Sequence, residues 1–367
     1  MKKTLIAVAA LSAMAASAMA ANVTVSGVVD LGLNFKNVKP IKGDTSRTFT
    51  MNAGQNSGSR VMFKGSEDLG NGVEVGFQLE SGFKADDGKL GADSNIFQRE
   101  SRLYVKTAFG TLHAGRFGVM DAGTGSLSIF GGGDLCAFGT GLGDTIGKES
   151  VIFEGLSTRL DNTLAYQSPT FAGATLYVAH SFKNASNSAK TELEGRPSAD
   201  QYNGVGLKYA NGPFNAALVA SQTNYKTVGA KPKNSKVYSF GAGYNFGVCK
   251  LMAEGQYFNM GRAWDSGVNS LKSNNKGWGT IVSVTAPVAG GNILASVGYK
   301  DAENIDNSAM KNKVWNAGLE YTYSFSKRTT FYVGAGYTEN KTEGQTDATK
   351  NGKVKTTEVV TGLVHKF

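Results

Sequence analysis

After residue 20 the sequence contains no run of about 18 apolar residues, which is close to the shortest length that lets a helix cross a bilayer. The chain is nevertheless 41% hydrophobic, with its apolar residues spread among 48 glycines, 14 tyrosines and 20 phenylalanines. A helical membrane protein is therefore excluded. A closed sheet could still span a membrane, because only every second residue of a barrel strand faces lipid. A soluble, secreted array of β-sandwiches is the alternative that this composition leaves open.

Histidine is also scarce, and its distribution argues against catalysis. His113, His180 and His365 fall on separate predicted strands, with no cysteine or carboxylate at the spacing of a metal site. A barrel lipase or protease would need a serine or aspartate beside a histidine on adjoining strands, and only His180 with Ser181 approaches that pattern. The sequence therefore predicts neither an enzyme nor a metal or cofactor site.

The two ends of the chain carry signals of export to an outer membrane. Residues 1–3 form a positive head, residues 4–11 an apolar stretch and residues 18–20 a small-x-small cleavage site, which is typical of a secretory signal peptide. We therefore expect a signal peptide over 1–20 and a mature domain over 21–367. Alternate residues from Val359 to Phe367 lie on one face of a strand that ends on an aromatic carboxy-terminus, which indicates an outer-membrane β-barrel.

Beyond residue 20 the sequence divides into sixteen strand-length segments of alternating character. Short connections rich in Gly, Asn and Asp, such as 67–72 and 211–213, are predicted to be periplasmic turns. Long polar connections at 36–59, 84–98, 184–201, 261–277 and 339–355 are predicted to be solvated outer loops. The predicted fold class is all-β, a 16-stranded antiparallel transmembrane β-barrel with both termini on the periplasmic side. The sixteen segments are 23–35, 60–66, 73–83, 99–107, 111–119, 160–168, 174–183, 202–209, 214–225, 237–246, 250–260, 278–286, 292–300, 314–325, 329–337 and 356–367.

One connection, from about 120 to 158, is longer than the others and more apolar. A loop of this length in a compact fold is usually functional or disordered. It carries more apolar surface than the other loops, which favours a loop packed inside the barrel over a solvated one. Its apolar residues include Leu127, Ile129, Phe130, Leu135, Phe138, Leu142 and Ile146. Folded inward, this third outer loop would narrow a lumen that sixteen strands otherwise leave as a wide aqueous channel.

Four stretches of the chain resemble the general, trimeric porins of Gram-negative bacteria, most closely those of β-proteobacteria. They are VTVSGVVD at 23–30, SRVMFKGSEDLG at 59–70, FGTLHAGR at 109–116 and GLVHKF at 362–367. The resemblance covers the mature chain. It implies a homotrimer of 16-stranded barrels in which the third outer loop folds inward, with basic residues on the barrel wall facing acids on the loop.

Five arginines are candidates for that basic wall. Arg60 is opposite in parity to Val61 and so points into the lumen by alternation alone. Arg116 ends a motif that the resemblance places just before the inward loop. Arg159 opens the next strand, where Leu160 is expected to face lipid and Arg159 the lumen.

Arg99 and Arg102 compete for one position on the same wall. The resemblance implies Arg99, from its spacing to Phe109, whereas Arg102 has the inward parity relative to Leu103 and Val105. The sequence leaves this choice open.

The inward loop departs from the pattern of the family. The family resembles Pro-Glu-Phe-Gly-Gly where this chain reads Ser-Ile-Phe-Gly-Gly at 128–132, so the usual glutamate is missing, and Val28 replaces a lysine on the first strand. Asp121, Asp134 and Asp144 are the nearest acids. Each is a candidate constriction carboxylate, with a solvated loop acid as the alternative.

The charge of the chain predicts a preference among solutes. The formal net charge is +9, or +7 without Lys2 and Lys3, and luminal arginines with few opposing acids raise the local concentration of anions. The scattered lysines lack adjacent stacking aromatics, so they suggest outer-membrane lipid and lipopolysaccharide as partners and not nucleic acid. The sequence thus predicts a diffusion channel for small hydrophilic solutes and ions, with a ligand-specific porin or a surface adhesin or receptor as alternatives.

Three further expectations concern assembly, the cysteines and the aromatic residues. Small surfaces at Gly27, Gly32, Gly76, Gly110 and Gly115 are expected to let a neighbouring subunit approach in a trimer. The two cysteines, at 136 in the inward loop and at 249 in a periplasmic turn, are expected to be too far apart for a disulfide. Phenylalanines beside the turns and tyrosines nearer the outer ends are expected to form interfacial girdles: Phe171, Phe214, Phe246, Phe325, Tyr177, Tyr257 and Tyr337.

Overall fold

The structure is a computed structural model that describes residues 23–91, 95–130, 134–139, 141–156, 159–183, 194–195, 199–225, 234–260 and 274–367. The expected signal peptide and its cleavage site lie outside these residues. Among the described residues, no helix is both long and apolar enough to cross a membrane. The described elements are β1 (Thr24–Lys39), β2 (Ser46–Ala53), β3 (Arg60–Asp68), β4 (Glu74–Gly82), β5 (Glu100–Thr107), β6 (Gly110–Phe117), α2 (Glu149–Ile152), β7 (Leu160–Gln167), β8 (Ala174–Ser181), β9 (Gln201–Asn211), β10 (Phe214–Asn224), β11 (Ser235–Asn245), β12 (Lys250–Met260), β13 (Asn275–Val288), β14 (Gly291–Asn304), β15 (Lys311–Ser324), β16 (Thr329–Glu343), the 3₁₀ helix η1 (Ala348–Lys350) and β17 (Gly352–Lys366).

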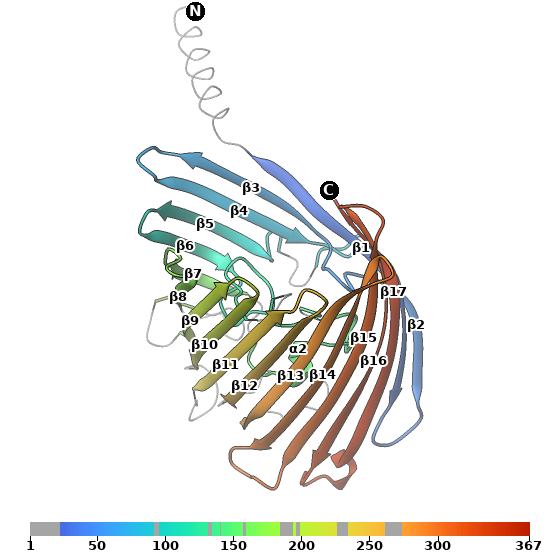
Figure 1. Cartoon of the computed structure of the whole chain (residues 1–367). Coiled ribbons are helices and arrows are strands. Elements are labelled where there is room, and N and C mark those ends of the chain that lie inside the picture. The colour runs from blue at the N-terminus through green and yellow to red at the C-terminus, as the bar shows by residue number, and fades with distance from the viewer. Residues whose placement is uncertain are drawn as a thin grey trace, which may run out of the picture.

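These strands form one closed antiparallel sheet (Figure 1). Each strand from β3 to β17 pairs with the next along the chain, and β17 pairs with β1 over twelve residues, from Val28 opposite Lys366 to Lys39 opposite Lys355. The N-terminal part of β1, from Thr24 to Val28, pairs with β3, which completes the ring. Closure pairs the described strands on both sides, as a sheet in lipid requires, except for β2, which pairs with β1 alone.

The second barrel strand is divided into β2 and β3, which is where the sequence prediction was wrong. The region 36–59 was expected to be a solvated loop, but β1 continues to Lys39 and β2 pairs with it from Leu31 opposite Ala53 to Val38 opposite Ser46. Counting β2 and β3 as one interrupted strand gives the sixteen barrel strands that the sequence predicts. The other predicted segments all coincide with observed strands, within a few residues at most ends.

The wall differs in height around the barrel (Figure 1). Strands β5 to β8 are 8 residues long, whereas β13 to β17 are 14 or 15 residues long. Because these tall strands extend at their outer ends, the predicted loops 261–277 and 339–355 are too long at one or both ends: β13 begins at Asn275, β16 ends at Glu343 and β17 begins at Gly352.

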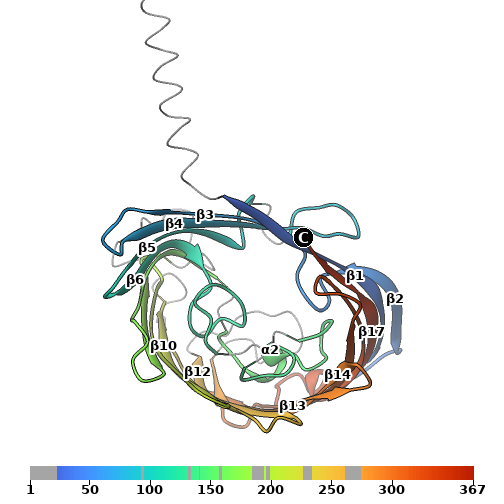
Figure 2. The same ribbon diagram turned by 45° about the horizontal axis from the view of Figure 1, so that its top comes forward.

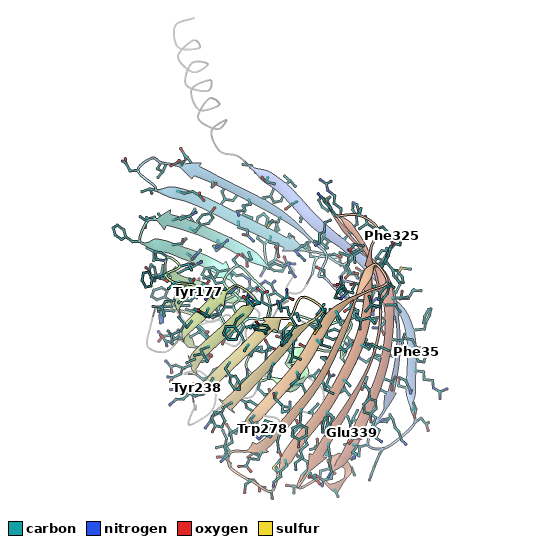
Figure 3. All side chains as sticks on the ribbon, in the orientation of Figure 1. Phe35, Tyr177, Tyr238, Trp278, Phe325 and Glu339 are labelled. Carbon is teal, nitrogen blue, oxygen red and sulfur yellow. The ribbon has the colours of Figure 1, made fainter. Side chains whose placement is uncertain are left out.

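Side chains alternate between the outer and inner faces of the sheet. Outer-face positions carry apolar and aromatic residues. Among them, Phe35, Tyr238, Trp278 and Phe325 are 41–65% exposed on the outside of the barrel (Figure 3). Tyr177 was expected in the outer girdle, but it is only 7% exposed. On β8 its neighbours Leu176 and Val178 face outward instead, so Tyr177 packs inside the barrel.

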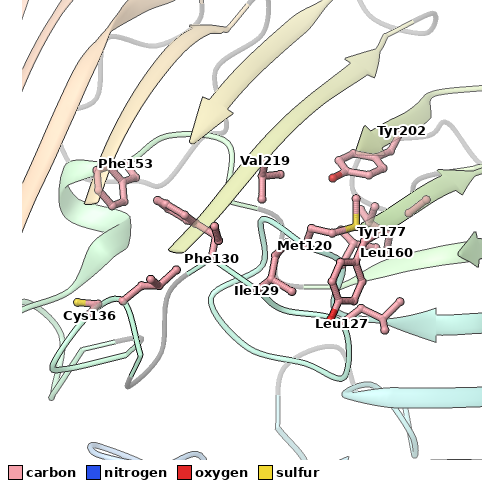
Figure 4. Packing of buried hydrophobic residues seen from close by; sticks show 14 of the residues in the cluster. Met120, Leu127, Ile129, Phe130, Cys136, Phe153, Leu160, Tyr177, Tyr202 and Val219 are labelled. Carbon is pink, nitrogen blue, oxygen red and sulfur yellow. The ribbon is translucent and has the colours of Figure 1, made fainter. Parts of the chain in front are cut away.

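The segment between β6 and β7 folds into the interior of the barrel (Figure 2). We call its described residues 118–130, 134–139 and 141–156 the inward loop. The loop buries one cluster of apolar side chains against the inner faces of β7 to β10, β13 and β15 (Figure 4). Phe130 and Phe153 lie in this cluster with ring centroids 5.6 Å apart, and neither is more than 2% exposed. The apolar content that distinguishes this loop in the sequence is therefore its core.

Candidate functional site

The start of the inward loop is attached to the wall by a buried aspartate. Both carboxylate oxygens of Asp121 accept hydrogen bonds, one from the Tyr202 hydroxyl at 2.9 Å and the other from the Ser221 hydroxyl at 2.7 Å. Asp121 is fully buried, and burial raises the pKa of its carboxyl. The sequence offered Asp121 as a constriction carboxylate. The structure instead places it where it holds the loop against β9 and β10, away from water.

The far end of the loop is attached to the opposite wall by Glu358 of β17. Its carboxylate accepts hydrogen bonds from the backbone N–H groups of Asp144 and Thr145, at 2.8 to 3.1 Å, and from the Thr145 hydroxyl at 2.8 Å. The side-chain amide of Asn34 donates a further hydrogen bond at 2.6 Å. Glu358 is fully buried. Charge-assisted hydrogen bonds of this kind are stronger than neutral ones, so the loop tip is firmly held.

A second short segment, residues 54–59 between β2 and β3, is held on the same side of the lumen. One oxygen of Asp30 accepts hydrogen bonds from the backbone N–H groups of Asn56 and Ser57 at 2.7 and 2.6 Å, and the other accepts one from the Tyr332 hydroxyl at 2.7 Å. The backbone N–H of Gly143 in the inward loop donates to the carbonyl of Gln55. The inward loop and the segment 54–59 therefore meet inside the barrel.

Two of the candidate arginines flank one glutamate on the wall beside this segment. Glu80 of β4 lies 3.7 Å from Arg60 and 2.5 Å from Arg99. Arg60 also donates to the carbonyl of Gly58 at 2.7 Å, while the guanidinium of Arg99 lies against Gly58, where a Cβ atom would approach it to 3.0 Å. Arg60 lies on the inner face of β3, as its parity predicts.

The other two arginines of this group lie where the inward loop begins and ends. Arg116 forms an ion pair with Asp161, and its Nε donates to the carbonyl of Gln98 at 2.7 Å. Arg159 donates to the Thr124 hydroxyl of the loop at 2.9 Å. Burial, followed by the positive charge of Arg99, lowers the pKa of Arg159 to about 10, so it remains protonated at neutral pH. We refer to Arg60, Arg99, Arg116 and Arg159 as the arginine wall.

Arg102 lies on the inner face of β5 but does not share these contacts. Its guanidinium bonds to Gln78 at 2.9 Å and to His113 at 2.8 Å, and its Nε lies 3.7 Å from Glu100. Its side chain is 8% exposed, compared with 20% for Arg99. Of the two residues between which the sequence did not decide, Arg99 therefore belongs to the arginine wall. The parity argument does not apply to Arg99, because Arg99 precedes β5 and so does not follow the alternation of side chains along that strand.

Alternation also failed at the start of β7. Leu160 was expected to face lipid, but it is 1% exposed and packs in the core of the inward loop. The register between β6 and β7 shifts between Gly115 and Phe117, so that Phe117 pairs with Leu160, and Asn162 takes a left-handed φ of 49°. Such a bulge reverses the side of the sheet on which the following residues lie.

The two remaining candidate aspartates of the inward loop, Asp134 and Asp144, are paired with lysines that the sequence analysis did not single out. Asp134 lies 2.8 Å from Lys250 and 3.9 Å from Lys208, and the hydrogen bond from Lys250 lowers the pKa of its carboxyl. Asp144 lies 2.9 Å from Lys36 of β1. All three lysines have inward parity on their strands, which is the signal that could have identified them.

The space beside each of the five glycines expected to admit a neighbouring subunit is occupied by other atoms of the same chain, which at Gly115 are backbone atoms of β5. A Cβ at Gly27 would lie 2.4 Å from the ring of Phe367, and one at Gly76 would lie 2.3 Å from that of Tyr104. Gly32 and Gly110 are covered by tyrosines in the same way. The expectation for the cysteines is confirmed, since both are free thiols.

Three comparisons relate this arrangement to known proteins. A family model described as Gram-negative porin matches residues 7–343. An outer membrane porin protein of Bordetella pertussis is 30% identical over 404 residues, covering the whole of both chains. Outer membrane porin protein 32 of Delftia acidovorans is 30% identical over 342 residues, covering 93% of this chain and 90% of that one. The solved structure of an anion-selective porin from Comamonas acidovorans is similar with a TM-score of 0.73 at 25% identity, covering 95% of this chain and all of that one.

Proposed function

The chain belongs to the Gram-negative porin family and is an outer-membrane channel, and we propose that it conducts small hydrophilic solutes and ions with a preference for anions. In this proposal the inward loop narrows the lumen, and solutes pass between the loop and the arginine wall. The related porin of Comamonas acidovorans is described as anion-selective, which supports the same preference here.

The balance of charge at the arginine wall carries this proposal. Four guanidinium groups, those of Arg60, Arg99, Arg116 and Arg159, are accompanied by the carboxylates of Glu80 and Asp161. The two arginines in excess leave this wall positive. A lumen lined by one sign of charge with low-dielectric walls concentrates ions of the opposite sign.

Ion selectivity in planar bilayers tests the proposal. The wild-type channel should give reversal potentials that report a preference for chloride over potassium. The preference should weaken as salt rises, since the Debye length falls from about 10 Å at 0.1 M to about 3 Å at 1 M. Replacing both Arg60 and Arg159 by Ser should reduce or reverse the preference.

A matched double variant separates the arginine wall from net charge. Arg47 of β2 and Arg328 in a periplasmic turn are exposed residues outside the arginine wall. The double variant Arg47→Ser with Arg328→Ser therefore removes the same amount of charge and leaves the arginine wall intact. This control should keep the wild-type selectivity. Preference for potassium in the wild type, or equal effects of the two double variants, would refute the proposal.

A ligand-specific channel is the second candidate, because the inward loop and the wall line an open, polar pocket. The pocket has a volume of about 300 Å³ and is lined by Thr124, Ser128 and Asp134 of the loop with Lys208 and Asn215 of β9 and β10. Conductance that saturates with one solute, and is restored by Lys208→Ala, would favour this candidate. Conductance proportional to concentration favours the general channel.

We also propose that the channel is a homotrimer in contact through the short wall. A barrel strand needs about 9–11 residues to cross the hydrocarbon layer, and β5 to β8 have 8 each. A neighbouring subunit would shield this wall from lipid. Crosslinking in mild detergent should yield a species of three times the subunit mass, and a monomer under these conditions would contradict the proposal.

Two further proposals concern export and the outer leaflet. Residues 1–20 act as a cleaved signal peptide, so the intact mass of the mature protein should correspond to a chain beginning at Ala21. The outer leaflet, with its anionic lipopolysaccharide, would contact outward-facing lysines beyond the aromatic girdle, such as Lys353 and Lys355, which lie 2.6 and 3.6 Å from Glu339 (Figure 3).

A further inference from the structure

Three potential metal ligands converge where the inward loop meets β12. They are the thiol of Cys136, the carboxylate of Glu149 at the first residue of α2 and the carboxylate of Glu254 on the inner face of β12. One donor atom from each lies within 4.8 Å of the other two. The three residues come from separate parts of the chain, and each is at most 2% exposed.

The backbone near this cluster is hydrogen-bonded to the neighbouring strands β12 and β13. Beside Cys136, the N–H of Ala137 donates to the Ser283 hydroxyl of β13 at 3.0 Å. Beyond α2, the N–H of Glu154 donates to the side-chain carbonyl of Gln256 on β12 at 2.8 Å. Cys136 also packs in the apolar cluster of the inward loop (Figure 4). The donors are therefore held in place before any ligand binds.

The chemistry of these groups suits a cation. A thiol and two carboxyl groups whose donor atoms lie within 4.8 Å of one another repel one another when all three are ionised, so a cation among them would be stabilised. Burial, and then the charges of Glu149 and Glu254, raise the pKa of Cys136 well above its ordinary value. A cation that binds thiolate strongly would displace the thiol proton to solvent, which makes binding dependent on pH.

We propose that Cys136, Glu149 and Glu254 form a binding site for a divalent cation of the zinc class, and that the cation ties the inward loop to β12. Zinc accepts mixed thiolate and carboxylate ligands, and three protein ligands leave room for a water molecule. The hard cations Mg²⁺ and Ca²⁺ prefer sites made of oxygen alone, so the thiol selects against them. Bound metal would hold the loop closer to the wall.

Titration of the folded full-length porin in detergent with Cd²⁺ tests the site, because cadmium bound to thiolate has a charge-transfer absorption in the ultraviolet. We expect one equivalent per chain, with binding that weakens as the pH is lowered. Cys249→Ser is the matched control, since Cys249 lies in a periplasmic turn. This variant should keep the signal, and Cys136→Ser should abolish it.

Glu149→Gln and Glu254→Gln test the carboxylates without removing the thiol. Each should weaken Cd²⁺ binding by about 100-fold while circular dichroism shows an intact barrel, in line with the losses seen when groups around metal sites are changed. Should a variant fail to fold, protection of the wild-type chain decides: Cd²⁺ should slow alkylation of Cys136 and leave that of Cys249 unchanged. Absence of a thiolate signal in the wild type, or a signal that depends on Cys249, would overturn the proposal.

Discussion

Glu358 connects the tip of the inward loop to β17 through hydrogen bonds from two backbone N–H groups, a hydroxyl and an amide. Asp121 and Asp30 hold the start of the loop and the segment 54–59 in the same way. At the scale of single residues, buried carboxylates thus hold the inward loop and the segment 54–59 in place, whereas the guanidinium groups of Arg60, Arg99 and Arg116 are partly exposed.

We predict that Glu358→Gln loosens the loop tip. The amide group of glutamine would meet N–H donors where the carboxylate now accepts, and each lost charged hydrogen bond costs about 1.5–3 kcal/mol. Single-channel recordings should show added current noise or sub-conductance states. Glu339→Gln is the control, because Glu339 forms its ion pair with Lys353 on the outer face of β16; equal noise in both variants would contradict the prediction.

Asp121 should make stability depend on pH. Its pKa is raised above 3.8 by burial, so the folded chain binds this proton more tightly than the unfolded chain. The contribution is then fully present below the unfolded pKa and is lost as the pH rises towards the folded pKa. The melting temperature of the wild type should fall relative to Asp121→Asn as the pH rises from about 4. Melting curves that shift in parallel would show that Asp121 does not titrate in this range.

At the scale of elements, the inward loop is a small hydrophobic core inside a barrel whose outer face is also apolar. Phe130 and Phe153 bring its two halves together, and Phe117, Leu160 and Tyr177 supply the wall beneath. The loop therefore depends on packing as well as on its buried carboxylates.

Phe130→Ala should loosen this loop without opening the barrel. Truncating a fully buried phenylalanine costs about 3–5 kcal/mol, and this loss falls on loop packing because Phe130 lies outside the strands. We expect higher conductance or greater noise with unchanged strand content by circular dichroism. The matched variant Phe171→Ala alters a residue that is 84% exposed at a turn, and it should behave as wild type. A conductance equal to wild type in Phe130→Ala would show that the loop holds without this ring.

At the scale of the whole molecule, the barrel presents apolar surface in all directions, and only part of it can meet another subunit. On β2, Phe49 and Met51 are 70% and 55% exposed on the outer face, beside Phe35 and Leu33 of β1. This patch lies on the side of the barrel away from β5 and β6 (Figure 2), so it is not part of the short wall through which we propose that the subunits meet.

Replacing Leu103 of β5 and Leu112 of β6, two short-wall residues that are 53% and 51% exposed, by Ser should weaken the trimer. A large apolar side chain buried at an interface contributes about 1.5–3 kcal/mol, so the double variant should shift crosslinked material from trimer to monomer. Val282→Ser with Val297→Ser changes two outward residues of the tall wall, which are 44% and 51% exposed. That control should remain trimeric; dissociation of both variants alike would place the contact elsewhere.

The alternation of side chains determined most of the fold from sequence alone. A period of two in hydrophobicity requires an extended backbone with one apolar and one polar face. Together with the export signals and the turn residues at short connections, this period predicts a closed barrel. The inward loop was also predictable, because its apolar residues need a partner. Arg60 could be placed for the same reason.

Tertiary structure decided whatever local periodicity does not control. The bulge between Gly115 and Phe117 places Leu160 on the inner face of the sheet. Part of the region that was expected to be a loop forms β2, which pairs with β1. Arg99 belongs to the arginine wall because it forms an ion pair with Glu80. Asp121 is buried because it accepts hydrogen bonds from Tyr202 and Ser221, which are remote from it in sequence. Contacts between such residues arise only when the sheet closes, since closure brings distant strands to face one another across the interior.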